Sequence, residues 1–109
     1  MKQSVSFNDF VMAFHSHNRY DQFGFDGLRV LFDYLNEYEN DTGEQIELDV
    51  IAFCCEYAYS TWDEIVDAYS IDVTDLRTEE DKRDAVREYL EENTSICGET
   101  DTGIVYAQF

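Results

Sequence analysis

The chain has 109 residues, which suits a single domain, and its 25 Asp and Glu against 7 Lys and Arg give a formal net charge of −18 at pH 7. This charge argues against direct binding to DNA, RNA or an anionic membrane, because such ligands need a basic surface to neutralise their phosphates. Apolar residues make up 44% of the chain and aromatic residues 16%, so it should fold as one compact acidic domain over residues 1–109 rather than remain disordered.

The first half of the chain predicts two amphipathic helices. Ser6 followed by Asp9 resembles a capping box, and the apolar residues after it recur at helical spacing, which predicts a helix over residues 7–17. Residues 18–24 are expected to form a loop. A second apolar stripe then predicts a helix that ends at Gly43, and its members are Leu28, Leu31, Phe32, Leu35 and Tyr38.

The second half predicts a buried strand, two further helices and a hairpin. Residues 50–57 form a short apolar run that is interpreted as a largely buried strand, although periodicity alone leaves a buried helix open. Thr61 and Glu64 have capping-box spacing at the start of a short helix, and a helix over 79–92 follows. From Thr94 onward, the chain is typical of two short strands joined by a turn that contains glycine. The expected fold class is α+β, with about four helices packed on a small antiparallel sheet of about three strands.

The negative charge is concentrated in the middle of the chain. Residues 30–76 contain 13 acidic residues and no Lys or Arg. On the second predicted helix, Asp33, Glu37 and Asp41 follow one another at i,i+4 spacing, where like charges destabilise a helix by about 0.2–0.5 kcal/mol per pair. Local stability does not explain this row. Its carboxylates are spaced about 6 Å apart and loosely imitate part of the phosphate track of a nucleic-acid strand.

We therefore predict a partner-binding surface made of carboxylates. Its members lie on the second helix, in the loop after it and on the short helix that starts near residue 62: Asp33, Glu37, Glu39, Asp41, Glu44, Glu47, Asp49, Asp63, Glu64 and Asp67. The helix over 79–92 is left out, because Glu79 with Arg83 and Arg87 with Glu91 have the spacing of supporting ion pairs.

An alternative is that the charge serves only solubility, as in halophilic proteins. The chain would then be a structural or regulatory interaction module, with a homodimer interface formed by aromatic residues. Tyr20, Phe23 and Phe25, in the segment before the second apolar stripe, are the candidates for such a patch.

The sequence predicts no catalytic residue, no metal site and no cofactor. His15 and His17 would point in different directions on a helix, and the three cysteines show no CxxC spacing. Cys54 and Cys55 would face opposite sides of the predicted strand. The glycine of the acidic loop comes too early for a calcium-binding loop. An odd number of cysteines indicates reduced thiols, as expected in a cytoplasm.

The order of segments resembles one group of proteins. It runs FDGLRVLFDYLNEYENDTGEQIELDVIAFCCEYAY, then STWDEIVDAY, then a charged helix and the end IVYAQF. Over residues 6–109 it is similar to small acidic hypothetical proteins of tailed bacteriophages and prophages. By size and composition the chain also resembles antirestriction and anti-CRISPR proteins that mimic DNA. These resemblances imply a non-enzymatic phage or mobile-element protein of the bacterial cytoplasm. Its partner would be a basic, nucleic-acid-binding host defence protein, such as a restriction, BREX or CRISPR component.

Overall fold

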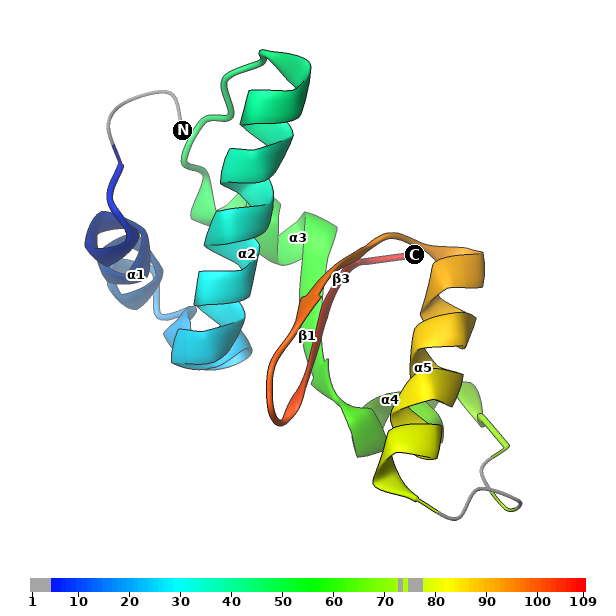
Figure 1. Cartoon of the computed structure of the whole chain (residues 1–109). Helices are drawn as coiled ribbons and strands as arrows, with labels where there is room; N and C mark the ends of the chain where they lie inside the picture. Colours follow the sequence, from blue (N-terminus) through cyan, green and yellow to red (C-terminus); the bar gives the residue numbers. More distant parts are fainter. Residues whose placement is uncertain (1–4, 73, 75–77) are drawn as a thin grey trace.

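A central three-stranded sheet lies between two layers of helices (Figure 1). The computed structural model describes residues 5–72, 74 and 78–109. Its elements are, in chain order, α1 (Phe7–Ser16), α2 (Tyr20–Thr42), α3 (Val50–Glu56), β1 (Tyr57–Thr61), α4 (Trp62–Tyr69), α5 (Glu79–Asn93), β2 (Ile96–Glu99) and β3 (Gly103–Ala107). Strand β3 is central and pairs antiparallel with both β1 and β2. The predicted α+β class is confirmed, with five helices over the described residues where about four were expected.

Side chains and one glycine determine where several helices begin and end. Ser6 and Asp9 form a capping box at α1, in which each side chain accepts the backbone N–H of the other residue at 3.1 Å. Thr61 and Glu64 form the same reciprocal arrangement at the start of α4. Gly43 ends α2 in the left-handed conformation, at a φ of 74°. The predicted starts of α1 and α4 and the predicted end of α2 are therefore confirmed.

The strand predicted over residues 50–57 is wrong, because all but the last of these residues belong to helix α3. The Asp49 carboxylate caps this helix by accepting a backbone N–H of its first turn at 3.1 Å. Val50 and Phe53 are buried three residues apart, whereas Ile51 between them is 47% exposed. One buried side and one exposed side are typical of an amphipathic helix. The first strand of the sheet, β1, follows directly.

The loop predicted over residues 18–24 is shorter in the structure, because Asn18 and Arg19 join α1 to α2 and the chain is helical from Tyr20 onward. The Tyr20 ring stacks on His15 of α1 with 4.1 Å between centroids, and Phe23 is buried. A kink at Gly24, with φ 71° and ψ 175°, separates this turn from the rest of α2. That region of backbone conformation is open essentially to glycine alone. Residues 20–23 thus form a helical turn that packs on α1, although the composition of this segment is typical of a loop.

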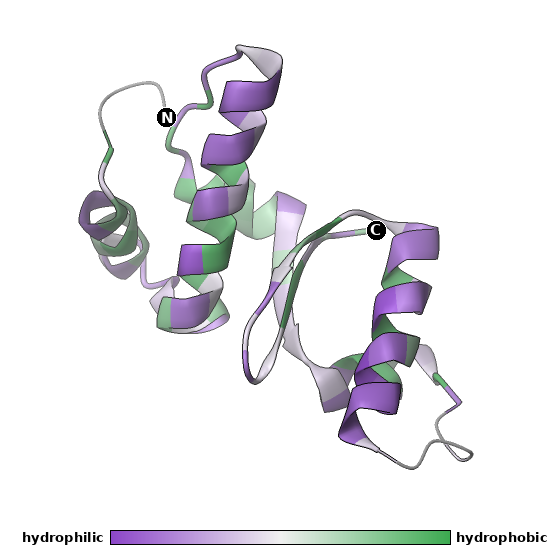
Figure 2. Ribbon diagram, viewed as in Figure 1, coloured by the Kyte–Doolittle hydropathy of each residue, from purple (hydrophilic) through white to green (hydrophobic). Residues whose placement is uncertain are grey.

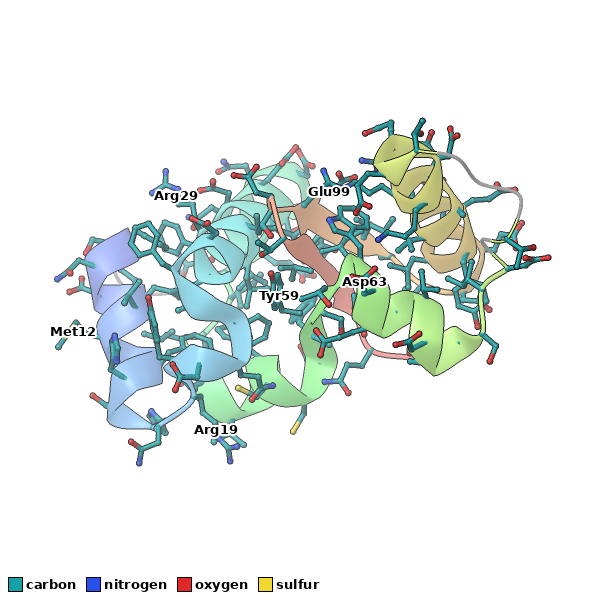
Figure 3. All side chains as sticks on the ribbon, turned by 90° about the horizontal axis from the view of Figure 1, so that it is seen from below. Met12, Arg19, Arg29, Tyr59, Asp63 and Glu99 are labelled. Carbon is teal, nitrogen blue, oxygen red and sulfur yellow. The ribbon has the colours of Figure 1, made fainter. Side chains whose placement is uncertain are left out.

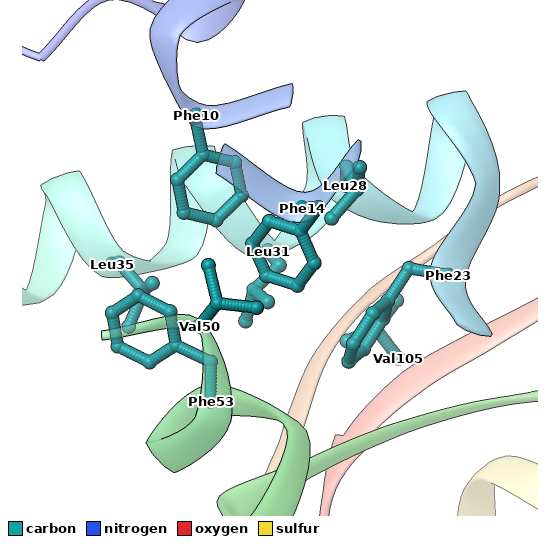
Figure 4. Packing of buried hydrophobic residues seen from close by; sticks show 9 residues of the cluster. All are labelled: Phe10, Phe14, Phe23, Leu28, Leu31, Leu35, Val50, Phe53 and Val105. Carbon is teal, nitrogen blue, oxygen red and sulfur yellow. The ribbon is translucent and has the colours of Figure 1, made fainter. Parts of the chain in front are cut away.

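The sheet separates two hydrophobic clusters. Val105 of β3 belongs to the cluster formed with α1, α2 and α3, whereas its neighbours Ile104 and Tyr106 belong to the cluster formed with α4 and α5. This division follows from the alternation of side chains along a strand. In the view from below, Tyr59 of β1 lies between the two layers (Figure 3). Figure 4 shows the buried members of the first cluster: Phe10, Phe14, Phe23, Leu28, Leu31, Leu35, Val50, Phe53 and Val105.

The outer sides of α2 and α5 are polar, because each helix buries only its inner side against the sheet. Helix α5 begins after the cap at Thr78 and buries Val86 and Leu90. Hydrophilic residues run along α5 and along the second half of α2 (Figure 2). Over the part of the chain that the structure describes, no helix combines the length and the apolar character needed to cross a membrane.

Candidate functional site

Three carboxylates of the predicted binding surface lie in a row along the exposed side of α2. This α2 carboxylate row consists of Asp33, Glu37 and Asp41. Asp33 forms an ion pair with Arg29, with 3.3 Å between Nε and Oδ2. Among the described residues, Glu37 and Asp41 have no ion-pair partner. Uncompensated charge therefore lies toward the C-terminal end of α2, where the helix dipole adds a partial negative charge.

The acidic residues predicted near the end of α2 and in the loop after it have different roles. Glu39 accepts the backbone N–H of Ile46 at 2.7 Å and so ties the loop to the helix. Asp49 caps α3. Glu44 and Glu47 are exposed and have no ion-pair partner within residues 5–72, 74 and 78–109. Two of the four predicted residues thus have a structural role, and the other two extend the charge of the α2 carboxylate row.

The three carboxylates of the predicted binding surface that lie on α4 belong to the other helix layer. Asp63 forms an ion pair with Lys82 of α5 at 2.5 Å, and Glu64 is part of the capping box with Thr61. Asp67 is exposed. Because α2 and α4 pack on opposite faces of the sheet, the structure does not bring the α4 carboxylates together with the α2 carboxylate row.

Among the cations of α5, Arg87 forms the most ion pairs, and one of these pairs joins the helix to the sheet. It donates to both carboxylate oxygens of Glu99 on β2, at 2.5 and 2.8 Å. It also pairs with Asp84 at 2.6 Å and with Glu80 at 3.2 Å. The i,i+4 pair predicted between Arg87 and Glu91 is therefore replaced by a contact between α5 and the hairpin of β2 and β3.

The other cations of α5 are also used within the protein. The guanidinium carbon of Arg83 lies 5.2 Å from the ring centroid of Trp62. Arg83 also forms the predicted ion pair with Glu79, at 3.9 Å, and Lys82 pairs with Asp63 of α4. The solvent side of α5 is consequently acidic, which was not predicted. Its exposed carboxylates include Asp81, Asp84, Glu88, Glu91 and Glu92. Most of these residues are spaced three or four positions apart, a pattern in the sequence that predicts one acidic side of a helix.

The pair between Arg87 and Glu99 predicts a pH-dependent contribution to stability. Hydrogen bonds from Arg87 lower the pKa of Glu99, and burial opposes them. The stabilisation is therefore complete at neutral pH and is lost as the pH falls through this lowered pKa. Glu99→Gln should reduce the free energy of unfolding by about 1 kcal/mol at pH 7. In urea unfolding at several pH values, the difference from the wild type should shrink below about pH 4.

Glu92→Gln is the matched control for this prediction, because Glu92 is exposed and no described ion pair involves it. It removes the same charge and should cause no loss of stability. Equal losses for Glu99→Gln and Glu92→Gln would contradict the role of the Arg87 pair, as would a difference that does not change with pH.

Two hollows open along the seam between α2 and β2. The larger has a volume of about 390 Å³ and is lined by Tyr34, Glu37, Tyr38, Asp41, Ile96 and Cys97. The smaller has a volume of about 290 Å³ and is lined by Asp26, Arg29, Val30, Glu99, Thr100 and Asp101. Between them α2 approaches β2 closely, because a Cβ at Gly98 would lie 2.7 Å from Cγ1 of Val30. We call this pair of hollows the α2–β2 groove.

The larger hollow combines neutral half-buried side chains with exposed charges. Burial raises the pKa of Tyr34 and raises that of Cys97 to about 12, so both groups are protonated at neutral pH. Glu37 and Asp41 carry the negative charge. Tyr38 was expected to complete the buried stripe of α2, but it is 44% exposed and lines the hollow instead. The hollow therefore offers aromatic rings beside uncompensated carboxylates.

The described part of the chain holds no metal site assembled from its histidines and cysteines. Within it, no three His, Cys, Asp or Glu side chains gather as a metal site would require. Cys54 and Cys55 lie on α3, so their expected placement on opposite faces of a strand is wrong. His17 Nδ1 lies 2.9 Å from the carbonyl oxygen of Ala13 in its own helix.

The chain matches no protein-family model, no curated protein and no solved structure. Its function is therefore inferred from its own charges and geometry.

Proposed function

We propose that this protein is a non-enzymatic binding protein of a phage or mobile genetic element that counteracts a host defence protein. Its α2 side would bind the basic surface with which a restriction, BREX or CRISPR component holds nucleic acid. The observation that carries the proposal is the uncompensated charge on this side. Glu37, Asp41, Glu44 and Glu47 are exposed and lack an ion-pair partner among the described residues.

The distribution of cations supports this proposal. Of the five Lys and Arg residues that the structure describes, four form ion pairs within the protein: Arg29, Lys82, Arg83 and Arg87. Few positive charges therefore offset the carboxylates that face solvent. Repulsion among these carboxylates destabilises the folded chain, so retaining them requires a benefit elsewhere, and binding to a basic partner supplies one.

Carboxylates on a helix can substitute for phosphates in a basic channel. Positions four residues apart on α2 are separated by about 6 Å along the helix axis, and phosphates of one strand follow at about 3.4 Å of axial rise, so the match is loose. Opposite charges would accelerate the encounter of the two proteins and make it sensitive to salt. The protein would then occupy the channel and exclude the nucleic acid.

The proposal is tested by capture from a bacterial host lysate on the immobilised protein, followed by mass spectrometry. We expect to recover a nucleic-acid-binding defence protein that is released by duplex DNA and by raised salt. The variant with Asp33, Glu37, Asp41 and Glu44 all replaced by Lys should lose it.

A second variant with the same net charge is the control. It replaces Asp67, Glu88, Glu91 and Glu92 of the other helix layer by Lys, and all four are exposed. This variant should retain the partner. Loss in both variants would show that only the net charge matters. Retention in both, or failure of DNA to compete, would overturn binding through the α2 side.

A homodimeric interaction module is the second candidate function, and one exposed ring favours it. Phe25 is 57% exposed and packs edge-on against Phe7 with 5.3 Å between centroids. Of the other two aromatic residues predicted for this interface, Phe23 is buried in the core and Tyr20 is half-buried. Light scattering at low and high salt separates the two functions. An apolar dimer persists or tightens as salt rises, whereas a complex held by carboxylates weakens.

A further inference from the structure

We infer that the larger hollow of the α2–β2 groove binds an arginine side chain of the basic partner. This inference rests on the proposed function and specifies which chemical group of the partner the α2 side recognises. The hollow, of about 390 Å³, falls in the range of about 300–1,000 Å³ that is common for small-ligand sites. It is lined by aromatic, apolar and carboxylate side chains together.

The protein already places its own arginines between rings and carboxylates. Arg29 lies 4.9 Å from the ring centroid of Phe7 while pairing with Asp33. Arg87 lies 5.3 Å from the ring centroid of Trp62 while pairing with Glu99. In both cases the guanidinium contacts a ring and pairs with a carboxylate at the same time.

The larger hollow contains the ring and the carboxylates of this arrangement without the cation. Tyr38 is partly exposed beside Glu37 and Asp41, and all three lie on one side of α2 at spacings of one, three and four residues. No Lys or Arg lines this hollow within the described part of the chain. Positive charge is the complement of these groups, and the occupant would come from the partner.

Arginine suits the hollow better than lysine. A guanidinium is planar, is weakly hydrated, stacks on aromatic rings and donates from five N–H groups, so one side chain can contact a ring and two carboxylates. A lysine ammonium is a compact and strongly hydrated charge that binds carboxylates without the planar stacking. The hollow should therefore distinguish the two cations, which a merely acidic surface would not do.

The test is an NMR titration of the ¹⁵N-labelled full chain with three capped pentapeptides, Gly-X-Gly-X-Gly, in which X is arginine, lysine or neutral citrulline. The arginine peptide should shift the amide signals of Tyr38 and Cys97 and bind about fivefold tighter than the lysine peptide. The citrulline peptide should not bind. Equal affinities for arginine and lysine, or shifts spread over all acidic residues, would overturn the inference.

Substitutions separate the contribution of the Tyr38 ring to binding from that of the Glu37 and Asp41 carboxylates. Tyr38→Leu keeps the net charge and should bring the arginine peptide to the affinity of the lysine peptide. Glu37→Gln with Asp41→Asn should abolish binding of both peptides. The control Glu44→Gln with Glu47→Gln removes the same charge outside the hollow and should leave the affinity within about twofold. Far-ultraviolet circular dichroism checks that each variant is folded.

The outcomes distinguish this inference from the proposed function. If Tyr38→Leu has no effect on peptide binding while the partner is still captured and displaced by DNA, arginine recognition in the hollow is wrong and the proposed function stands. If the arginine peptide binds as expected but no nucleic-acid-binding protein is captured, the hollow is an arginine site and the proposed function is wrong.

Discussion

Gly103→Ala is expected to lower the free energy of unfolding by about 3 kcal/mol or more. A Cβ at this position would lie 2.3 Å from the carbonyl oxygen of Ser60 and 3.0 Å from Cα of Thr61. Both atoms belong to the backbone of β1, which pairs with β3 in this register. A flexible side chain could move away from the new methyl group, but a paired backbone cannot do so without breaking the ladder.

The effect should be large because Gly103 begins the central strand. Residues of β3 contribute to both hydrophobic clusters, and β3 holds β2 in place beside α2. A shift of β3 would therefore disturb both helix layers and the α2–β2 groove. Urea unfolding followed by circular dichroism at neutral pH measures the loss.

Gly43→Ala is the control for the steric part of this prediction. Gly43 has a φ of 74°, but a Cβ there would meet nothing within 4 Å. Its replacement should cost only the strain of a left-handed residue, about 1–2 kcal/mol. A loss for Gly103→Ala no greater than that for Gly43→Ala would contradict the predicted clash.

Phe14→Ala is expected to lower the free energy of unfolding by about 3–5 kcal/mol. The Phe14 side chain is fully buried, and its ring centroid lies 5.0 Å from that of Phe10 and 5.8 Å from that of Phe23. The substitution removes the ring that joins α1 to the first turn of α2 and leaves a cavity. Met12→Ala, on the exposed side of the same helix, should change stability by less than about 0.5 kcal/mol.

The same variant tests whether the two clusters unfold together. Trp62 is the one tryptophan of the chain and lies in the cluster opposite Phe14. Because β3 joins both clusters, Trp62 fluorescence and circular dichroism should report the same lowered midpoint. A fluorescence transition that stays at the wild-type midpoint would show that the two helix layers unfold separately.

The charge of −18 has a different distribution in three dimensions than along the chain. The acidic stretch over residues 30–76 does not form one surface, because the sheet separates its α2 part from its α4 part. The solvent side of α5 proves to be acidic as well. On the α2 side, Glu37 and Asp41 border a hollow that is also lined by the aromatic side chains of Tyr34 and Tyr38.

Local signals in the sequence determined much of the fold. The spacing of Ser6 with Asp9 and of Thr61 with Glu64 indicates two helix starts, and Gly43 indicates a helix end, because capping depends on residues only a few positions apart. Apolar periodicity likewise identified most of the inner side of α2. The row of Asp33, Glu37 and Asp41 follows from the helix repeat alone.

Tertiary packing decided the rest. A short apolar run does not distinguish a strand from a helix, and residues 50–56 became α3 because one side packs on α1 and α2 while the other meets solvent. The pairing of Arg87 with Glu99 and the approach of Gly98 to Val30 join residues remote in sequence. The first contact turns Arg87 of α5 toward the sheet, and the second brings β2 against α2 at the α2–β2 groove. A row of carboxylates can thus be read from the sequence, whereas the hollow beside it exists only once β2 packs against α2.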